Sequence, residues 1–598
     1  MATKKRSLIA PPGGPASGPQ ARLAQMRIVA QDPSVRGRHG EILTAVVDVP
    51  AETLAAGPRG YRVHVIDYDA STGRLYPPVA YDREAGGWRA DPAAEVTEDV
   101  ILRDPGFHAQ NVYAIVMRTL ARFEFALGRR IGWGFDVTGH QIKVAPHAFE
   151  DANAFYSRRD EALLFGHFPT RDGKGHVFSC LSHDIVAHET SHAVLDGLRK
   201  RYMDPSSPDQ AAFHEGFADV VALLSVFAVK EVVRALIDVP AGGKAGEHGP
   251  LRDVSVAALR RSALFALGKQ FGQEMGSIGR SALRASADLV AKPGLASHPE
   301  FDEPHRRGEI IVAAVLHAFL AIWSRRLTAL RAHGPVDRDR AAEEGSDIAD
   351  DLLTVAIRAL DYCPPVHLRF GHFLSAMVTA DREVRPRDAR YGVRDALVAS
   401  FEAFGIGHQS VGRKGEARSD PGWQQATKKF DYDRTRFESM QRDPDEVFRF
   451  VWENRRELRL FSGAYTRVLS VRPCVRVAPE DGFTLRETVA EVFQQLSMLA
   501  GELGAHGIEK PAGMPDDTPI MLLGGVTLVF DEYGHVKYTI GDSVHDPSRP
   551  NVQARQGERL KSLWDHGFFR KAAAAGRRFS AVHRARSLDP VTQAREAW

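Results

Sequence analysis

The sequence has little cysteine, no long apolar run and no excess of either charge. Three cysteines in 598 residues, Cys180, Cys363 and Cys474, are too few and too scattered for a disulfide framework. No stretch approaches the roughly 18 apolar residues of a membrane span, and the first residues lack the apolar segment of a signal peptide. We therefore expect a cytoplasmic protein with no membrane partner.

Charge and length restrict the partners and the architecture. The 78 basic residues are balanced by 76 acidic residues, which argues against nucleic acid as a partner. A chain of 598 residues is longer than one hydrophobic core usually holds. We expect two lobes and a further module.

Composition shifts divide the chain into four regions. Residues 1–40 are rich in Pro, Gly, Ala and Arg without periodicity, which predicts a disordered arm. Residues 41–406 form the expected main domain, 407–445 a polar linker, and 446–598 a C-terminal α+β module of unknown role.

Hydrophobic periodicity predicts the elements of the main domain. Residues 41–49 and 61–68 alternate apolar with polar side chains, which predicts antiparallel strands. Helical spacing predicts helices over 107–127, 254–271, 308–331, 348–360, 370–381 and 394–404.

The C-terminal module reads as a mixture of helices and strands. We expect a helix over 447–460 and a strand over 468–477. Thr484-Leu-Arg-Glu487 resembles a capping box that opens a helix to Leu503. Residues 526–540 predict a hairpin with Gly534 in its turn.

One stretch of the main domain carries metal-ligand spacing. Residues 188–192 read His-Glu-Thr-Ser-His, and on a helix His188 and His192 lie on one face, where both imidazoles can bind one ion. Glu189 lies beside the first ligand, close enough to accept a proton from a metal-activated water. Glu215, separated from His192 by 22 intervening residues, is a candidate third ligand. Three protein ligands with an open position are typical of a catalytic zinc site.

Flanking motifs extend this pattern. Asn153-Ala-Phe-Tyr precedes it and Glu215-Gly-Phe-Ala-Asp219 follows it, and together the three segments resemble the thermolysin-type zinc metallopeptidases, a gluzincin family. The resemblance covers about residues 107–406. It implies a two-lobe α+β fold with a β-rich lobe over 41–180, the motif helix over 181–198, a helical lobe over 199–406 and zinc between the lobes.

The resemblance also implies roles for single residues. Asp219 would orient a ligand histidine, and Asn153 and Ala154 would bind substrate backbone by strand addition. Arg284, in Leu-Arg-Ala-Ser-Ala-Asp, would hold a substrate carbonyl. His305, before Arg306-Arg307 where the family usually has Asn-Ser, would stabilise the oxyanion, with Tyr202 as a second donor.

The implied cofactor is one zinc ion per chain. Asp184 matches a position that serves a calcium pair in secreted relatives, but Val226 stands where their bridging glutamate would be. Calcium is therefore not expected.

The expected function is zinc-dependent hydrolysis of peptide bonds by an intracellular endopeptidase, with Glu189 as general base and a peptide or protein as substrate. An alternative is a zinc-binding pseudo-protease that acts as an interaction scaffold through its C-terminal module. Hydrolysis of non-peptide amides would use the same machinery. Self-inhibition by the C-terminal module, or a protein partner bound to it, also stays open.

Overall fold

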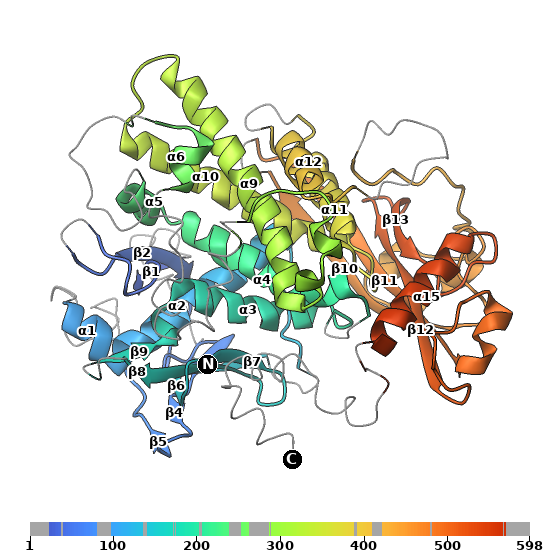
Figure 1. The fold of residues 1–598 in the computed structure, drawn as a ribbon, viewed down its shortest axis with the longest axis horizontal. Helices are drawn as coiled ribbons and strands as arrows, with labels where there is room; N and C mark the ends of the chain where they lie inside the picture. The colour runs from blue at the N-terminus through green and yellow to red at the C-terminus, as the bar shows by residue number, and fades with distance from the viewer. Residues whose placement is uncertain are drawn as a thin grey trace, which may run out of the picture.

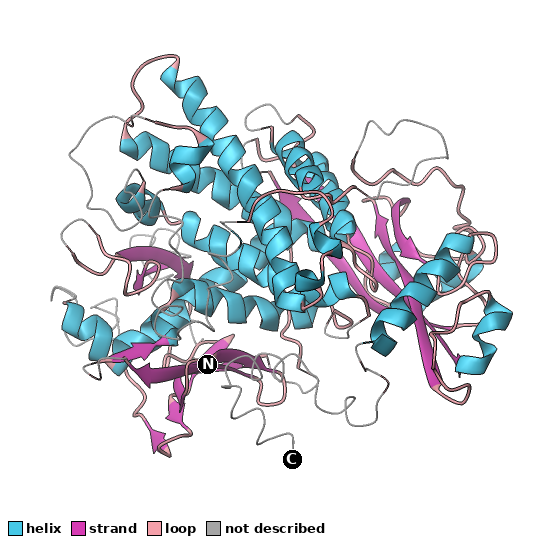
Figure 2. Cartoon of the chain, viewed as in Figure 1, coloured by secondary structure: helices cyan, strands magenta, loops and turns pink. Residues whose placement is uncertain are grey.

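Strands gather at two ends of the molecule and helices lie between them (Figure 2). The computed structural model describes residues 23–37, 40–80, 97–135, 140–170, 173, 175–202, 206–237, 251, 253–261, 286, 289–387, 392–408, 421–478, 481–565, 567 and 569. The chain is 44% helical and 22% strand, so the expected α+β class is confirmed.

A five-stranded sheet lies in the N-terminal part of the molecule (Figure 1). Its strands are, in order, β3 (Val63–Val65), β6 (Ile142–Glu150), β8 (Ala162–Pro169) and β7 (Ala154–Ser157), with β9 (His176–Phe178) also paired to β8. Strands β3 and β8 run parallel to β6, whereas β7 and β9 run antiparallel to β8. Within the described residues, β7 therefore forms an edge of this sheet.

A second, two-stranded sheet corrects the expectation of a disordered arm over 1–40. Strand β1 (Leu23–Val29) pairs antiparallel with β2 (Thr44–Pro50), and Met26, Ile28 and Val29 are buried. The short run of apolar residues in β1 is ordered by this partner strand. Residues 1–22 lie outside the described residues.

The predicted strands over 41–49 and 61–68 exist but do not pair with each other. The first, β2, pairs with β1, whereas β3 runs parallel to β6. A further small hairpin joins β4 (Tyr68–Asp69) to β5 (Arg74–Leu75).

Helix α2 (Pro105–Leu127) passes through the core, after the short helix α1 (Glu98–Arg103). Its start is fixed by Asp104, whose carboxylate accepts a hydrogen bond from the Gly106 N–H at 2.8 Å, and by Pro105 in the first turn. Gly128 ends it with a φ of 67°. The helix is buried on most sides and contacts β1, β2 and the motif helix.

The central region is helical. It contains α3 (His183–Leu198), α4 (Pro208–Phe227), α5 (Lys230–Leu236), α6 (Val256–Arg260), α9 (Pro304–Arg331), α10 (Arg338–Ala359), α11 (Phe370–Val384) and α12 (Val393–Ala403). The predicted helices over 308–331, 348–360, 370–381 and 394–404 are confirmed, whereas most of the one over 254–271 lies outside the described residues. Helix α9 is long and apolar enough to cross a membrane, but 72% of its most apolar window is buried inside the protein.

The C-terminal part is a four-stranded antiparallel sheet. Its strands, in order, are β10 (Tyr465–Val477), β11 (Thr484–Leu499), β12 (Pro519–Phe530) and β13 (Val536–Asp542), with helices α13 (Phe437–Met440), α14 (Pro444–Glu453) and α15 (Pro550–Asp565). The predicted strand over 468–477 and the hairpin around Gly534 are confirmed. The predicted helix over 484–503 is wrong. Residues 484–499 form the long strand β11 because they pair along their length with β10 and β12.

The predicted linker over 407–445 is ordered in its second half. Trp423 is buried, and its indole N–H donates to the Tyr362 carbonyl at 2.8 Å. Phe430 and Met440 belong to the hydrophobic core of the C-terminal sheet. Residues 409–420 lie outside the described residues.

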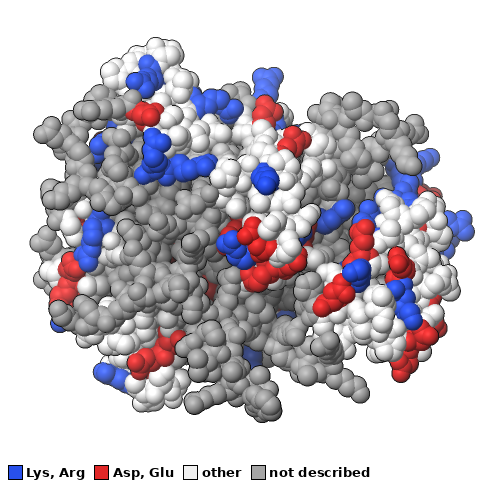
Figure 3. Space-filling model, in the orientation of Figure 1, with Lys and Arg blue, Asp and Glu red and all other residues white. Residues whose placement is uncertain are grey.

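Buried ion pairs fasten the C-terminal sheet to the motif helix. Arg199, which follows the last residue of α3, pairs with Glu491 of β11. Arg472 of β10 pairs with the same carboxylate at 3.1 Å and donates to the Leu198 carbonyl of α3. At the surface, by contrast, basic and acidic side chains are interspersed on the face in Figure 3.

Candidate active site

Helix α3 presents two imidazoles to one point. The Nε2 atoms of His188 and His192 lie 2.9 Å apart, as expected for residues one helical turn apart. The helix is buried on several sides, and its buried hydroxyl groups bond to the backbone of the same helix. Thr190 donates to the Val186 carbonyl at 2.6 Å, and Ser191 donates to the Ala187 carbonyl at 2.7 Å.

Helix α4 supplies a third donor. The Glu215 Oε2 atom lies 3.7 Å from Nε2 of His188 and 3.7 Å from Nε2 of His192. Donor atoms bound at about 2.0–2.2 Å to one tetrahedral zinc ion lie about 3.3 Å from one another. The observed separations of 2.9–3.7 Å bracket this value. Two imidazoles and a carboxylate therefore fit zinc, with a fourth position left for substrate or solvent.

The surroundings of His188 favour a cation. Its Nδ1 atom lies 2.8 Å from Asp219 Oδ1, one turn after Glu215 on α4, and this contact sets the tautomer that leaves the Nε2 lone pair directed at the metal position. Burial disfavours a charged ring, but the carboxylates of Asp219, Glu189 and Glu215 outweigh it and raise the pKa of His188 to about 10. The same three carboxylates stabilise a metal ion in place of that proton.

His214 completes the set around His192 and was missed by the sequence analysis. Its Nδ1 atom lies 2.8 Å from His192 Nδ1, and the two rings stack with centroids 4.7 Å apart. If His192 binds a metal through Nε2, its ring hydrogen is on Nδ1. The Nδ1 atom of His214 accepts this hydrogen and so fixes the orientation of the His192 ring. The only signal in the sequence was its position directly before Glu215.

Glu189 lies between the motif helix and edge strand β7. Its Oε2 atom accepts the Tyr156 N–H at 2.9 Å, and its side chain is buried. Ala154, two residues before Tyr156, directs its backbone groups to the same side of the strand. This side of β7 faces α3 rather than β8, and here the Ala154 N–H donates to the Asn153 side-chain oxygen at 2.9 Å.

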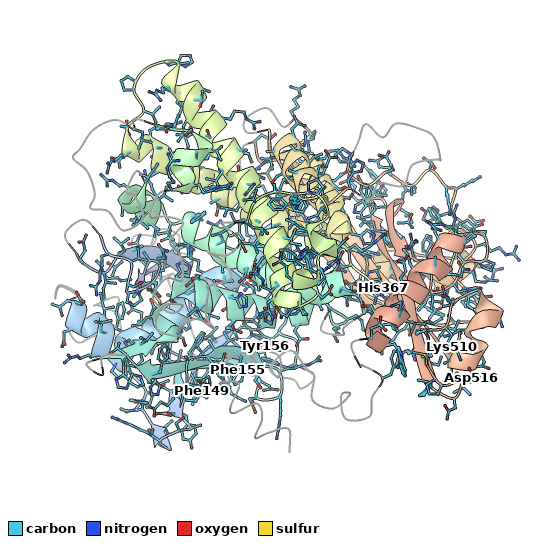
Figure 4. The ribbon with its side chains drawn as sticks, in the orientation of Figure 1. Phe149, Phe155, Tyr156, His367, Lys510 and Asp516 are labelled. Carbon is cyan, nitrogen blue, oxygen red and sulfur yellow. The ribbon has the colours of Figure 1, made fainter. Side chains whose placement is uncertain are left out.

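Aromatic packing and one further bond hold β7 in place. The rings of Phe149 and Phe155 stack with centroids 5.5 Å apart, and Figure 4 shows both beside Tyr156 at the N-terminal sheet. The Tyr156 hydroxyl donates to Asp196 of α3 at 2.8 Å. Both backbone and side chain of Tyr156 therefore connect the edge strand to the motif helix.

His305 reaches the group from α9. Its Nε2 atom lies 3.4 Å from Glu215 Oε2, and its Nδ1 atom lies 2.6 Å from Glu303. Arg306 and Arg307 pair with Glu309 and Asp209, at 2.7 and 2.5 Å. The two arginines thus point to other partners and leave His305 directed at the metal position.

Two glycines allow α9 to approach α4 this closely. A Cβ atom on Gly308 would lie 2.9 Å from the Ala212 carbonyl oxygen, and one on Gly216 would lie 2.7 Å from the Gly308 carbonyl oxygen. Contacts below 3.0 Å between such atoms require a shift of backbone. The glycine pair thereby sets the distance between His305 and Glu215, each of which lies within three residues of one glycine.

One predicted site residue, Tyr202, does not join the site. The Tyr202 hydroxyl is fully buried and donates its one hydrogen to the Pro364 carbonyl at 2.7 Å, so its predicted role as a second oxyanion donor is not supported. Arg284 lies outside the described residues.

Asp184 is buried in the first turn of α3, and burial together with the charge of Asp32 raises its pKa to about 7.

A cavity lies away from this site. It measures about 340 Å³ and lies between the helical region and the C-terminal sheet, where its lining includes Arg369, Arg559 and His367. Figure 4 labels His367. None of the predicted site residues lines this cavity.

No protein-family model matches the chain, and a search of curated proteins finds no match.

Proposed function

We propose that this chain is a zinc-dependent metallopeptidase with a thermolysin-like arrangement, in which the motif helix lies between a β-rich lobe and a helical lobe. One observation carries the proposal: donor atoms of His188, His192 and Glu215 lie within 4.8 Å of one another, and the buried carboxylate of Glu189 is close enough to act electrostatically on His188. A metal site needs only the three donors. The added buried carboxylate is what hydrolysis requires.

His188, His192 and Glu215 would hold the ion. Bound zinc supplies Lewis-acid activation of water and of a peptide carbonyl. Asp219 and His214 fix the ring orientations of the two histidines through their Nδ1 atoms.

Glu189 moves the proton. The Tyr156 N–H holds one carboxylate oxygen at 2.9 Å and so fixes the orientation of the group. Glu189 accepts a proton from the attacking water and delivers it to the leaving amine, which separates the two fragments.

His305 stabilises the oxyanion. Its Nδ1–H donates to Glu303 at 2.6 Å, so donation from Nε2 to the substrate oxygen requires both ring hydrogens. The carboxylates of Glu303 and Glu215 lie on either side of the ring, 2.6 Å from Nδ1 and 3.4 Å from Nε2. A donor of this type typically contributes about 2.7–4 kcal/mol to the transition state.

The substrate we propose is a peptide or protein segment in extended form. It would add to β7 at Ala154, on the edge turned away from β8, where backbone groups rather than side chains provide affinity. The three described cysteines are free and buried, which suits a reducing compartment such as the cytoplasm.

The test is removal and return of zinc during cleavage of a broad peptide library. We expect cleavage by the zinc-loaded protein, loss of cleavage after chelation and recovery on adding zinc. Zinc bound at His188 and His192 without any cleavage would favour the scaffold alternative, and no zinc binding would contradict both.

A further inference from the structure

A second group of metal-binding side chains lies in the N-terminal part of the molecule. His108 of α2, His147 of β6 and Cys180 of a short 3-10 helix (Ser179–Leu181) offer donor atoms that lie within 4.8 Å of one another. Their exposed fractions are 1%, 3% and 0%. None of the three takes part in the proposed catalytic reaction.

The hydrogen bonds of the two imidazoles direct a lone pair from each ring at the other. His147 Nδ1 lies 2.8 Å from Asp67 Oδ2, and His108 Nε2 lies 2.9 Å from the Ile101 carbonyl oxygen. A carbonyl and a carboxylate only accept, so each of these nitrogens carries the hydrogen. In neutral rings, the remaining nitrogens, His108 Nδ1 and His147 Nε2, then have lone pairs, yet they lie 2.7 Å apart.

Two lone pairs at this distance repel each other unless a cation lies between them. The outer contacts are those typical of metal-bound histidines, which donate their second N–H to a carboxylate or a backbone carbonyl. The proposed catalytic pair shows the same pattern: facing Nε2 atoms 2.9 Å apart, with Asp219 behind one ring. A proton shared between the rings would also relieve the repulsion, but it would not use the third donor, Cys180.

We propose that His108, His147 and Cys180 bind a second zinc ion in a structural site. The donor set of two nitrogens and one sulfur suits zinc. Charge supports this choice, because the thiolate of Cys180 and the carboxylate of Asp67 together balance a divalent cation in a buried site. A monovalent copper ion in the same place would leave one negative charge uncompensated.

The position of the site suggests what the ion stabilises. It joins α2, β6 and the 3-10 helix that leads into α3, and Cys180 lies eight residues before His188. Asn111, one turn after His108 on α2, donates to the Cys180 carbonyl at 2.8 Å. Zinc here would fix the approach to the motif helix, and the protein would carry two zinc ions per chain instead of the single ion expected from the sequence.

Zinc content of five purified proteins tests the proposal independently of catalysis. We expect two ions per chain in the wild type, one in His192→Ala, one in Cys180→Ser and none in the double variant. Cys363→Ser is the matched control, because Cys363 is equally buried but lies outside the group, and it should keep two ions.

Cobalt substitution identifies the ligand. In the full-length His192→Ala protein, Co²⁺ should give a sulfur-to-metal charge-transfer band, because the proposed catalytic site contains no sulfur ligand. The band should survive Cys363→Ser and disappear with Cys180→Ser. If Cys180→Ser does not fold, His147→Gln provides the second variant, with loss of one metal ion and of the band expected.

Several outcomes would overturn the proposal. They are a His192→Ala protein that binds no zinc and gives no thiolate band, a band that survives Cys180→Ser, or a site that takes Cu⁺ but neither Zn²⁺ nor Co²⁺. In the first case, a proton shared between the two rings would explain the short distance between His108 Nδ1 and His147 Nε2. Each outcome would leave the proposed peptidase function untouched, because that depends on zinc at His188, His192 and Glu215.

Discussion

Replacing Glu491 with glutamine should loosen the C-terminal end of the motif helix. Glu491 of β11 is 3% exposed and pairs with Arg199, which is 1% exposed, and with Arg472. Within the described part of the chain, it is the only carboxylate ion-paired with Arg199. The amide keeps the size of the side chain but removes the charge, and leaves two guanidinium groups close together without their shared counter-ion.

The expected cost follows from burial. Removing one partner of a buried ion pair typically costs about 3–5 kcal/mol, because the remaining charge stays out of water. Solvent screening does not reduce this cost much at 1–3% exposure. At about 1.4 kcal/mol per factor of ten, the amides at the end of α3 should exchange about a hundred- to a few-thousand-fold faster.

Hydrogen exchange followed by mass spectrometry measures this directly on peptides that cover residues 190–202. Glu532→Gln, in the exposed turn after β12, is the control and should leave exchange unchanged. Unchanged protection of α3 in Glu491→Gln would refute the view that this ion pair fastens the C-terminal sheet to the motif helix.

Three further predictions concern pH, helix packing and the metal. Burial raises the pKa of Glu491, but Arg199 and Arg472 outweigh it and lower it. The stabilisation is therefore complete above the ordinary carboxyl pKa and is lost as the pH falls, so below about pH 5 the wild type should lose free energy of unfolding faster than Glu491→Gln. In Gly308→Ala, the added Cβ should push α9 away from α4 and reduce peptide cleavage, whereas Gly504→Ala, with open space around it, should match the wild type in the same assay. Asp219→Asn should weaken zinc binding by about 10–100-fold in a competition titration with a chelator, and unchanged affinity would contradict its role behind His188.

Local spacing accounts for most of what the sequence predicted about the site. His188 and His192 lie one turn apart on any helix, as do Glu215 and Asp219, so only the helices themselves had to be inferred. The Tyr156 N–H bonded to Glu189 was not foreseen because a backbone group leaves no mark in the sequence. The approach of His305 depends on two glycines that lie 92 residues apart in the sequence.

Long-range pairing explains the errors. Residues 484–499 contain a plausible helix start, but hydrogen bonds to strands on both sides make them β11. Residues 23–29 are a short apolar run next to the Pro- and Gly-rich start of the chain, and they are ordered by pairing with β2. Tyr202 was predicted to be an oxyanion donor, yet it is buried and its ring packs against Phe213 with centroids 5.9 Å apart. In each case the structure of the segment depends on a partner elsewhere in the chain, which the hydrophobic pattern of the segment itself does not indicate.

The most direct test of the proposed peptidase function is the rate of peptide cleavage by Glu189→Gln with zinc retained. Glu150→Gln, an exposed glutamate on β6, serves as the matched control. We predict that Glu189→Gln binds as much zinc as the wild type and that its kcat/KM falls by about 10²–10⁴-fold, the usual contribution of a general base. Equal zinc content with undiminished cleavage would contradict the assignment of Glu189 and the mechanism built on it.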